Sequence, residues 1–295
     1  MRIGIDLGGS KTEGIVLSDR DEIIYRLRQT TPQAEGYKAV LENVTQLVAE
    51  LETKAGTSCS VGIGTPGSLS PETGLMRNSN TVCLNDQPML ADLNRLLARD
   101  IRIANDANCF ALSEATDGAA AGAEVVFGVI LGTGTGGGIV INGKLIHGAQ
   151  HIAGEWGHNP LASENRPCYC GRLDCVETYL SGRGLVQTWH QAGGKGEVNV
   201  REIVALASED DTLALTALNH YHAYFARALA NVINILDPDV VVLGGGLSNI
   251  ESLYDKGAVA LEQHIFSDTM RTRIVKNKHG DSSGVRGAAW LWDAR

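Results

Sequence analysis

The sequence lacks the features that would place the chain in a membrane or on a nucleic acid. No apolar run approaches the roughly 20 residues of a membrane-spanning helix. The opening residues, MRIGIDLGG, read as a strand and not as the basic segment and apolar core of a secretory signal. Lysine and arginine form no cluster and the formal net charge is −9, which argues against nucleic-acid and anionic-membrane partners. We therefore expect a cytoplasmic protein.

The common nucleotide-binding signatures are also missing. The chain has two glycine-rich hairpin turns, DLGGSKT and LGTGTGGG. Neither matches the phosphate-loop pattern GxxxxGK[ST], and neither leads directly into a helix, as a dinucleotide-binding fingerprint requires. The 295 residues, 43% hydrophobic and 20% charged, are typical of a globular protein with room for two domains. Glycine is in excess at 35 residues. Much of it lies in short clusters after apolar runs, unlike the glycine of a low-complexity linker.

The first half of the chain predicts an α/β arrangement. Short β runs at 3–7, 13–17 and 22–27 indicate a three-stranded antiparallel meander. A helix over 36–53 carries an apolar stripe at helical spacing, which we interpret as core packing. Further predicted elements are a strand from Ser60, a helix over 89–99, a strand over 101–106, a helix from Ala107, a helix over 213–236, a buried strand within DPDVVVLGGG, and a terminal helix over 284–292.

Residues 125–148 repeat the plan of the opening segment: strand, glycine-rich turn, strand, tight turn and strand. The tight turn contains Asn142-Gly143, the dipeptide favoured where both central residues take positive φ. An internal duplication explains the repeat. We expect a small lobe at 1–118, a large lobe at 119–283, and a C-terminal helix of about 284–295 that packs back on the small lobe.

A histidine and three cysteines lie within eighteen residues, in the segment GHNPLASENRPCYCGRLDC. His158, Cys168, Cys170 and Cys175 supply one imidazole and three thiolates, a complete tetrahedral ligand set for zinc. With no open position, such a metal would be structural and would make the loop 158–175 rigid. Buried thiols, or one disulfide and a spare cysteine, are the alternative. A redox role is disfavoured because Cys168 and Cys170 are separated by one residue and not two.

Two hairpin loops, DLGGSKT and LGTGTGGG, offer backbone N–H groups without obstructing side chains, as phosphate binding requires. Either could be only a tight hairpin. Two equivalent loops facing one cleft would be a nucleotide site. Asp6 in the first loop would repel phosphates unless a divalent cation lies between them, so it is a candidate Mg²⁺ ligand, through water. The alternative for Asp6 is a turn-capping role.

Asp106 follows the strand 101–106 at a position where ligands gather in open α/β sheets. A carboxylate there could accept the proton of an attacking hydroxyl, as the base does in phosphoryl transfer. The alternative is that Asp106 caps the following helix. The position of Asp106 in the sequence does not decide between these two roles.

Taken together, DLGGSKT, GTPGS, NDAN, LGTGTGGG, EWGHNP, CYCGRLDCVE and VVLGGG resemble the ROK family (repressors, open reading frames and kinases) over essentially the whole chain. Two segments, NDANCFALSEATDGAAAGA and KHGDSSGVRGAAWLW, carry a narrower resemblance to its bacterial fructokinase/mannokinase branch. The family usually has glycine where Asp174 stands. Because Asp tolerates left-handed backbone better than most residues, the zinc prediction is kept.

The resemblance implies an actin-like ATPase fold of two ribonuclease-H-like lobes with the active-site cleft between them, and a homodimer. It makes Asp106 the catalytic base and His158 both a metal ligand and a sugar ligand. The implied sugar-binding residues are Asn80, Asn105, Asp106, Glu155, His158 and Glu177. The implied ATP-binding residues are Asp6, Gly8, Gly9, Ser10, Lys11, Thr12, Gly132, Thr133, Gly134, Thr135, Gly136, Gly137 and Gly245.

We therefore expect an ATP- and Mg²⁺-dependent kinase that phosphorylates the 6-hydroxyl of a hexose, with fructose favoured and mannose or glucose as further substrates. An N-acetylated amino sugar, N-acetylglucosamine or N-acetylmannosamine, is the alternative substrate. A sugar-sensing repressor is a third reading, disfavoured because the sequence enters its first strand at Ile3 and the net charge is negative. Cys59, Cys83 and Cys109 suggest no role beyond small hydrophobic residues.

Overall fold

The computed structural model describes residues 1–292, which form two compact units. The first contains residues 1–122, residues 138–153 and the C-terminal segment from Lys278; the second contains residues 123–137 and 154–277. The lobe boundaries expected from the sequence stay a prediction, and residues 293–295 of the expected terminal helix lie outside the described part.

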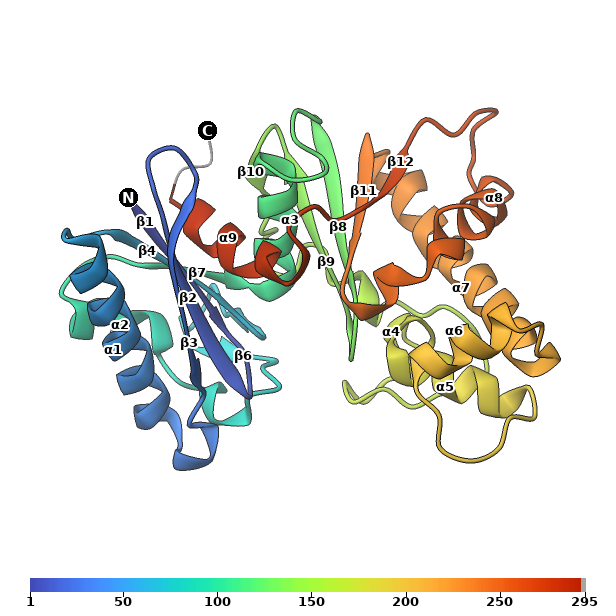
Figure 1. Cartoon of the computed structure of the whole chain (residues 1–295), viewed down its shortest axis with the longest axis horizontal. Coiled ribbons are helices and arrows are strands. Elements are labelled where there is room, and N and C mark those ends of the chain that lie inside the picture. The colour runs from blue at the N-terminus through green and yellow to red at the C-terminus, as the bar shows by residue number, and fades with distance from the viewer. Residues whose placement is uncertain (293–295) are drawn as a thin grey trace. The chain divides into compact units, whose positions relative to one another are not determined.

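The first unit is built on a five-stranded sheet in the order β3-β2-β1-β4-β7 (Figure 1). Strands β1, β2 and β3 form the predicted antiparallel meander, and β4 and β7 continue the sheet parallel to β1. The elements of this unit are β1 (Arg2–Leu7), β2 (Lys11–Leu17), β3 (Ile23–Thr30), α1 (Tyr37–Ala55), β4 (Ser60–Thr65), β5 (Ser68–Leu69), β6 (Met76–Arg77), α2 (Met89–Leu97), β7 (Arg102–Asn105), α3 (Asp106–Thr116), β10 (Lys144–Leu145) and α9 (Ser283–Trp290).

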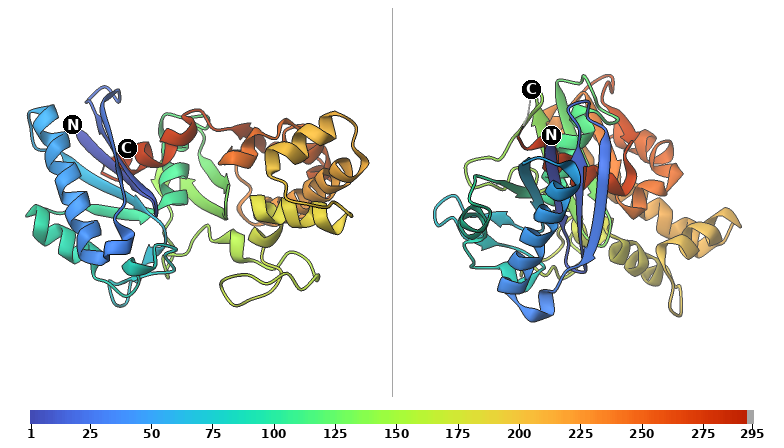
Figure 2. Two further views of the ribbon diagram at one scale, coloured as in Figure 1. Left: turned by 60° about the horizontal axis from the view of Figure 1, so that its bottom comes forward. Right: turned by 60° about the vertical axis from the view of Figure 1, so that its left-hand side comes forward.

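Helices cover both faces of this sheet (Figures 1 and 2). The predicted apolar stripe of α1 is buried and belongs to the core. Helix α9 packs on the opposite face, where a Cβ on Gly4 would lie 2.0 Å from the carbonyl oxygen of Val285 and one on Gly62 would lie 1.9 Å from that of Ala288. Only glycine allows a helix backbone to approach strands this closely.

The second sheet has the order β10-β9-β8-β11-β12 and repeats the plan of the first. Strands β9 and β10 are antiparallel, whereas β8, β11 and β12 are parallel. The predicted hairpin turn is confirmed, since Asn142 and Gly143 have φ of 50° and 71°. The strands and helices of the second unit are β8 (Val125–Leu131), β9 (Thr135–Ile141, which passes into the first unit after Gly137), α4 (Glu177–Leu180), α5 (Gly182–Gln191), α6 (Val200–Ser208), α7 (Thr212–Leu236), β11 (Val240–Gly244), α8 (Lys256–Glu262) and β12 (Arg273–Lys276).

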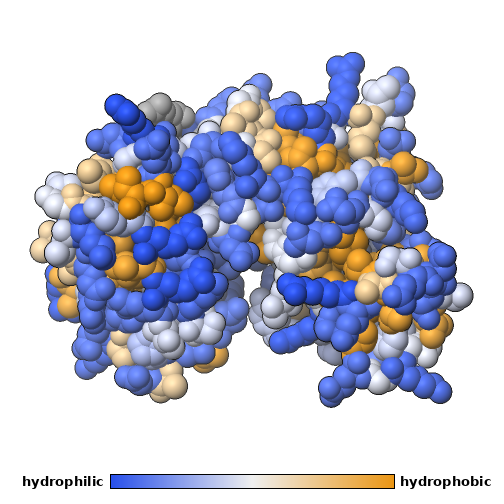
Figure 3. Space-filling model, in the orientation of Figure 1, coloured by the Kyte–Doolittle hydropathy of each residue, from blue (hydrophilic) through white to orange (hydrophobic). Residues whose placement is uncertain are grey.

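The two mixed five-stranded sheets agree with the α/β fold expected from the sequence. On the face shown in Figure 3, hydrophilic residues predominate and apolar residues form separate small groups. In the described part of the chain, every helix is too short or too polar to span a lipid bilayer.

Candidate functional site

Two carboxylates of the first unit lie at one edge of its sheet. Asp6 on β1 pairs in register with Gly64 on β4, and the next residue of β4, Thr65, pairs with Asn105 on β7. Asp106 follows directly, so both carboxylates lie where the parallel strands end. Burial, and then the negative charge of Asp106, raises the pKa of Asp6 to about 6. A cation would relieve this repulsion, which suits the predicted Mg²⁺ role of Asp6.

The cap of α3 is Asn105 and not Asp106, so the capping alternative for Asp106 is wrong. The Asn105 Oδ1 accepts a hydrogen bond from the Ala107 N–H at 2.9 Å, and its Nδ2 donates to the Gly67 carbonyl at 3.2 Å. Asp106 is the first residue of the helix, and its Oδ1 also accepts from the Ala107 N–H, at 2.8 Å. Both side chains therefore bond to the first turn of α3, and the role of Asp106 as a base stays a prediction.

The first glycine-rich loop, between β1 and β2, closes through a hydrogen bond of 3.0 Å from the Gly8 N–H to the Lys11 carbonyl. The buried Thr12 hydroxyl lies 2.9 Å from the hydroxyl of Thr31. Ser10 and Lys11 are exposed, as is Asn80. The Thr12 hydroxyl thus holds the hairpin together, whereas Ser10 and Lys11 are accessible to a ligand.

The second glycine-rich loop, between β8 and β9, is bound to a carboxylate. The Glu177 Oε2 accepts a hydrogen bond from the Thr135 N–H at 3.0 Å, and a Cβ on Gly134 would lie 2.5 Å from the same oxygen. Gly182, the first residue of α5, donates to the Gly132 carbonyl at 2.8 Å. The structure therefore places Glu177, which the family resemblance assigns to the sugar, against the predicted phosphate loop.

The four predicted metal ligands converge in the second unit, where their ligand atoms lie within 4.8 Å of one another. The Cys170 and Cys175 Sγ atoms are 3.6 Å apart, and the Cys168 Sγ lies 3.7 Å from the His158 Nδ1. Tetrahedral zinc with ordinary bond lengths separates its ligand atoms by about 3.6–3.8 Å. All three cysteines are free, so the disulfide alternative is wrong.

The other ring nitrogen of His158 contacts a residue that the sequence reasoning missed. Its Nε2 lies 3.1 Å from the hydroxyl of Tyr169, whose ring packs edge-on against the imidazole. Tyr169 stands between two metal ligands and is 74% exposed. Its place in the sequence, between the predicted metal ligands Cys168 and Cys170, could have indicated this contact. A sugar hydroxyl that reaches His158 must displace this tyrosine hydroxyl or share the nitrogen with it.

Asp174 has a φ of 57°, which confirms that aspartate takes the left-handed conformation where the family usually has glycine. Its carboxylate also accepts hydrogen bonds from three backbone N–H groups of the loop, those of Glu164, Asn165 and Arg166. The Tyr179 hydroxyl, and then these N–H groups, hold the pKa of Asp174 below its usual value. The substitution therefore adds side-chain bonds that fix the metal loop.

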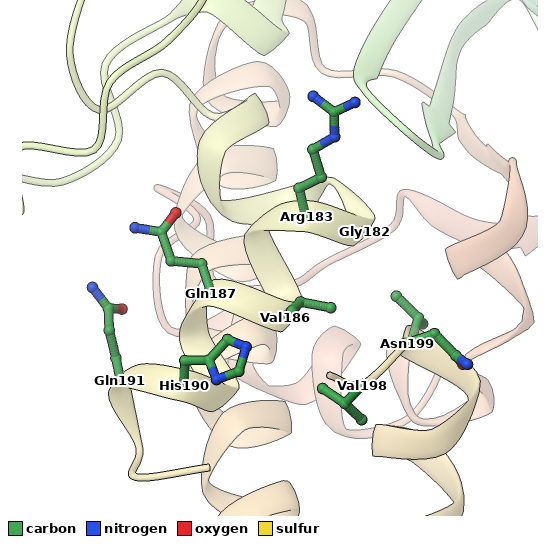
Figure 4. Close-up of a pocket in the computed structure, with 9 residues that line it drawn as sticks. Gly182, Arg183, Val186, Gln187, His190, Gln191, Val198 and Asn199 are labelled. Carbon is green, nitrogen blue, oxygen red and sulfur yellow. The ribbon is translucent and has the colours of Figure 1, made fainter. Parts of the chain in front are cut away.

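A pocket of about 660 Å³, which no sequence pattern predicted, lies beside α5. The side chains of Val186 and His190 extend from α5 toward Val198 and Asn199 (Figure 4). The pocket is lined by Gly182, Arg183, Val186, Gln187, His190, Gln191, Val198, Asn199 and Val200. Because Gly182 is bonded to the second glycine-rich loop, the pocket adjoins a predicted phosphate site.

The Asp6→Asn variant should be more stable than the wild type in the absence of ligands, by an amount that grows with pH. A carboxyl whose folded-state pKa is raised from 3.8 to about 6 stabilises the fold below pH 4 and loses that contribution as pH rises through 6. The expected gain at pH 7 is about 2–3 kcal/mol. Urea unfolding of both proteins from pH 4 to pH 7.5 measures it. A stability difference that is constant over this range would contradict the assignment.

Comparisons with known proteins agree with the fold and the site described above. The sequence model of the ROK family matches residues 2–295. An N-acetyl-D-glucosamine kinase of Escherichia fergusonii is 40% identical over 305 residues, covering 99% of both chains. A ROK hexokinase from Thermus thermophilus has a TM-score of 0.88 at 30% identity, covering 98% of this chain and 96% of that one. A ROK glucokinase from Streptomyces griseus in complex with glucose and AMPPNP has a TM-score of 0.79 at 25% identity, covering 98% of each.

Proposed function

The chain belongs to the ROK family of sugar kinases, and we propose that it transfers the γ-phosphoryl group of ATP to the 6-hydroxyl of N-acetyl-D-glucosamine. The observation that carries this choice is the full-length, 40% identity to an enzyme of that name. The sugar stays a proposal because binding residues can change within a conserved fold.

Fructose, favoured by the narrower resemblance, is the second candidate. The two segments behind that resemblance, 105–123 and 278–292, form helices α3 and α9, which pack on each other. The buried Glu114 carboxylate accepts hydrogen bonds from Ala119, Lys278, His279 and Ser283. Much of the shared sequence therefore supports a packing arrangement in the first unit, and it carries little information about the sugar.

In this proposal, Asp106 accepts the proton of the sugar hydroxyl as the γ-phosphoryl group is attacked. Asn80, Asn105, Glu155, His158 and Glu177 bind the sugar, and the loops 6–12 and 132–138 hold phosphates through backbone N–H groups. Asp6 would hold a hydrated Mg²⁺, which neutralises phosphate charge when bound. Each of these roles extends the family resemblance to the matching positions.

The pocket beside α5 and Gly245 are assigned to the nucleoside in the same proposal. The pocket adjoins the loop 132–138, and its walls combine apolar side chains with the polar His190 and Asn199. Such a mixture suits a base and ribose. Gly245 has a φ of 80°, and a Cβ there would lie 2.4 Å from the Leu131 carbonyl oxygen, so this turn requires glycine.

His158, Cys168, Cys170 and Cys175 would hold structural zinc in this proposal, since the measured separations fit its coordination. Four protein ligands leave no position for substrate or water. The metal would therefore fix the loop and orient His158. The protein's side chains, and not this metal, would take part in the reaction.

A panel of sugars tests the substrate. We expect kcat/KM from coupled ADP release to be at least about tenfold higher for N-acetyl-D-glucosamine than for N-acetylmannosamine, fructose, mannose or glucose, because one missing contact changes selectivity by about that factor. A higher value for fructose would replace the first candidate by the second. Phosphorylation of none of these sugars would reject the proposed substrate class.

A further inference from the structure

Arg166 is a cation buried inside the second unit, with 1% of its surface exposed. It lies in the metal loop, eight residues after His158 and two before Cys168. A buried guanidinium is costly unless its N–H groups are bonded. Here the side chain donates to the Glu164 carboxylate (3.1 Å), the carbonyls of Thr178 (3.1 Å) and Gly184 (3.5 Å), the Thr188 hydroxyl (3.2 Å) and the Gln191 amide oxygen.

Arg166 is also fixed to the metal loop itself. Its backbone N–H donates to Asp174, the neighbour of the metal ligand Cys175, at 2.9 Å. Its guanidinium lies 4.1 Å from the ring centroid of Tyr179, whose hydroxyl donates to the same Asp174 carboxylate. The position of Arg166 is therefore set by the conformation of the metal loop.

The guanidinium group of Arg166 donates hydrogen bonds to residues on one face of α5. Gly184, Thr188 and Gln191 are spaced four and three residues apart, which places them on a single helix face. Val186 and His190 lie on the opposite side of the helix and extend toward the far wall of the pocket (Figure 4). Arg166 thus bonds to the face of α5 that lies away from Val186 and His190, and one of its acceptors, Gln191, also lines the pocket.

We propose that Arg166 is a positioning residue that couples the metal loop to the pocket wall, so that metal binding increases the affinity for nucleotide as well as for sugar. The inference rests on the proposed function, in which this pocket receives the nucleoside of ATP. Removal of the metal frees the loop, the buried guanidinium loses its fixed position, and α5 loses the bonds that hold Gly184, Thr188 and Gln191.

The test measures ADP binding by titration calorimetry on full-length protein, with metal content determined on the same samples. Metal-loaded Arg166→Met should bind ADP about tenfold more weakly than the wild type, within the usual range of couplings between sites. Arg166→Lys should recover little, because a single ammonium cannot reach the same set of acceptors. Arg227→Met is the matched control: Arg227 donates to the loop carbonyl of Leu161 at 2.9 Å and does not line the pocket.

A second measurement uses the unaltered protein and does not depend on the folding of a variant. Chelation of the metal should weaken ADP binding by the wild type about tenfold, and should have little further effect on Arg166→Met. If Arg166→Met does not fold, Thr188→Val removes one acceptor and should give a smaller loss of about two- to fivefold.

The inference is overturned if metal-loaded Arg166→Met and the wild type bind ADP equally, or if chelation leaves ADP binding by the wild type unchanged. It is also overturned if Arg227→Met loses as much affinity as Arg166→Met, because the effect would then belong to the loop in general. A wild type that binds no ADP would instead reject the proposed function.

Discussion

Asp106→Asn is expected to lower kcat by about 10²–10⁴-fold while changing the sugar dissociation constant by less than about threefold. An amide has nearly the same shape as the carboxylate and its oxygen can still accept from Ala107 at the start of α3, but it cannot accept a proton. Since Asn105 caps the helix, the fold should persist. Coupled ADP release gives kcat, and calorimetry gives the sugar affinity.

The same substitution made at Asp100, an exposed aspartate of the same unit, serves as the control and should leave the rate unchanged. A near wild-type rate for Asp106→Asn would remove Asp106 from the role of base. Loss of one of two like charges should also lower the pKa of Asp6. The pH-dependent stability difference produced by Asp6→Asn should therefore become smaller in the Asp106→Asn background.

Cys170→Ser should reduce bound metal from one ion per chain to nearly none, and raise the sugar KM by about 10–100-fold, the effect seen when the support of a metal site is lost. Serine replaces one of the three thiolate ligands by a neutral hydroxyl. A site with four protein ligands has no further ligand that could take its place. Besides the hydrogen bonds of Asp174 and Arg166, the loop 158–175 contains two isolated β-bridges, Pro160 with Cys175 and Pro167 with Leu173. Metal analysis and sugar kinetics on the same preparation test this.

Cys83→Ser is the matched control, because this half-buried thiol belongs to the first unit and lies outside the metal cluster. It should retain both metal and KM. If Cys170→Ser kept full metal and a normal sugar KM, the metal site would not support sugar binding. If metal were lost without any change in KM, the cluster would be a stability element alone.

Local patterns predicted the main elements of the fold because they are fixed by neighbouring residues. The meander follows from alternation in short β runs, and the β9–β10 turn follows from Asn142-Gly143, which readily takes positive φ. The stripe of α1 has an ordinary helical period. In each case the residues that determine the conformation are close together in sequence.

No pattern in the sequence predicted α4, α5, α6, α8 or β12, which are all short. Helices of four to ten residues are unstable alone and form because they pack against the rest of the unit. One of them did carry a local signal: Asn199 and Glu202 form a capping box at the start of α6. The strand β12 has only four residues, and its neighbour β11 lies far away in sequence.

The metal ligands could be predicted because their chemistry and spacing are both visible in one segment. The contact of Glu177 with the Thr135 N–H could not, since it joins residues 42 positions apart. The contacts of Tyr169 and Arg166 depend on side-chain directions inside a folded loop. The identity of the sugar was the least predictable property, because the segments that suggested fructose largely pack against each other.

The position of α9 against Gly4 and Gly62 has a consequence for biosynthesis. During translation, β1 and β4 leave the ribosome more than 200 residues before Ser283–Trp290. Until then, the sheet face that receives this helix remains open on the nascent chain, and contacts of such large sequence separation form slowly. Chaperones that bind exposed apolar strands would have their longest opportunity on this surface, and truncation before residue 283 should yield an aggregation-prone product.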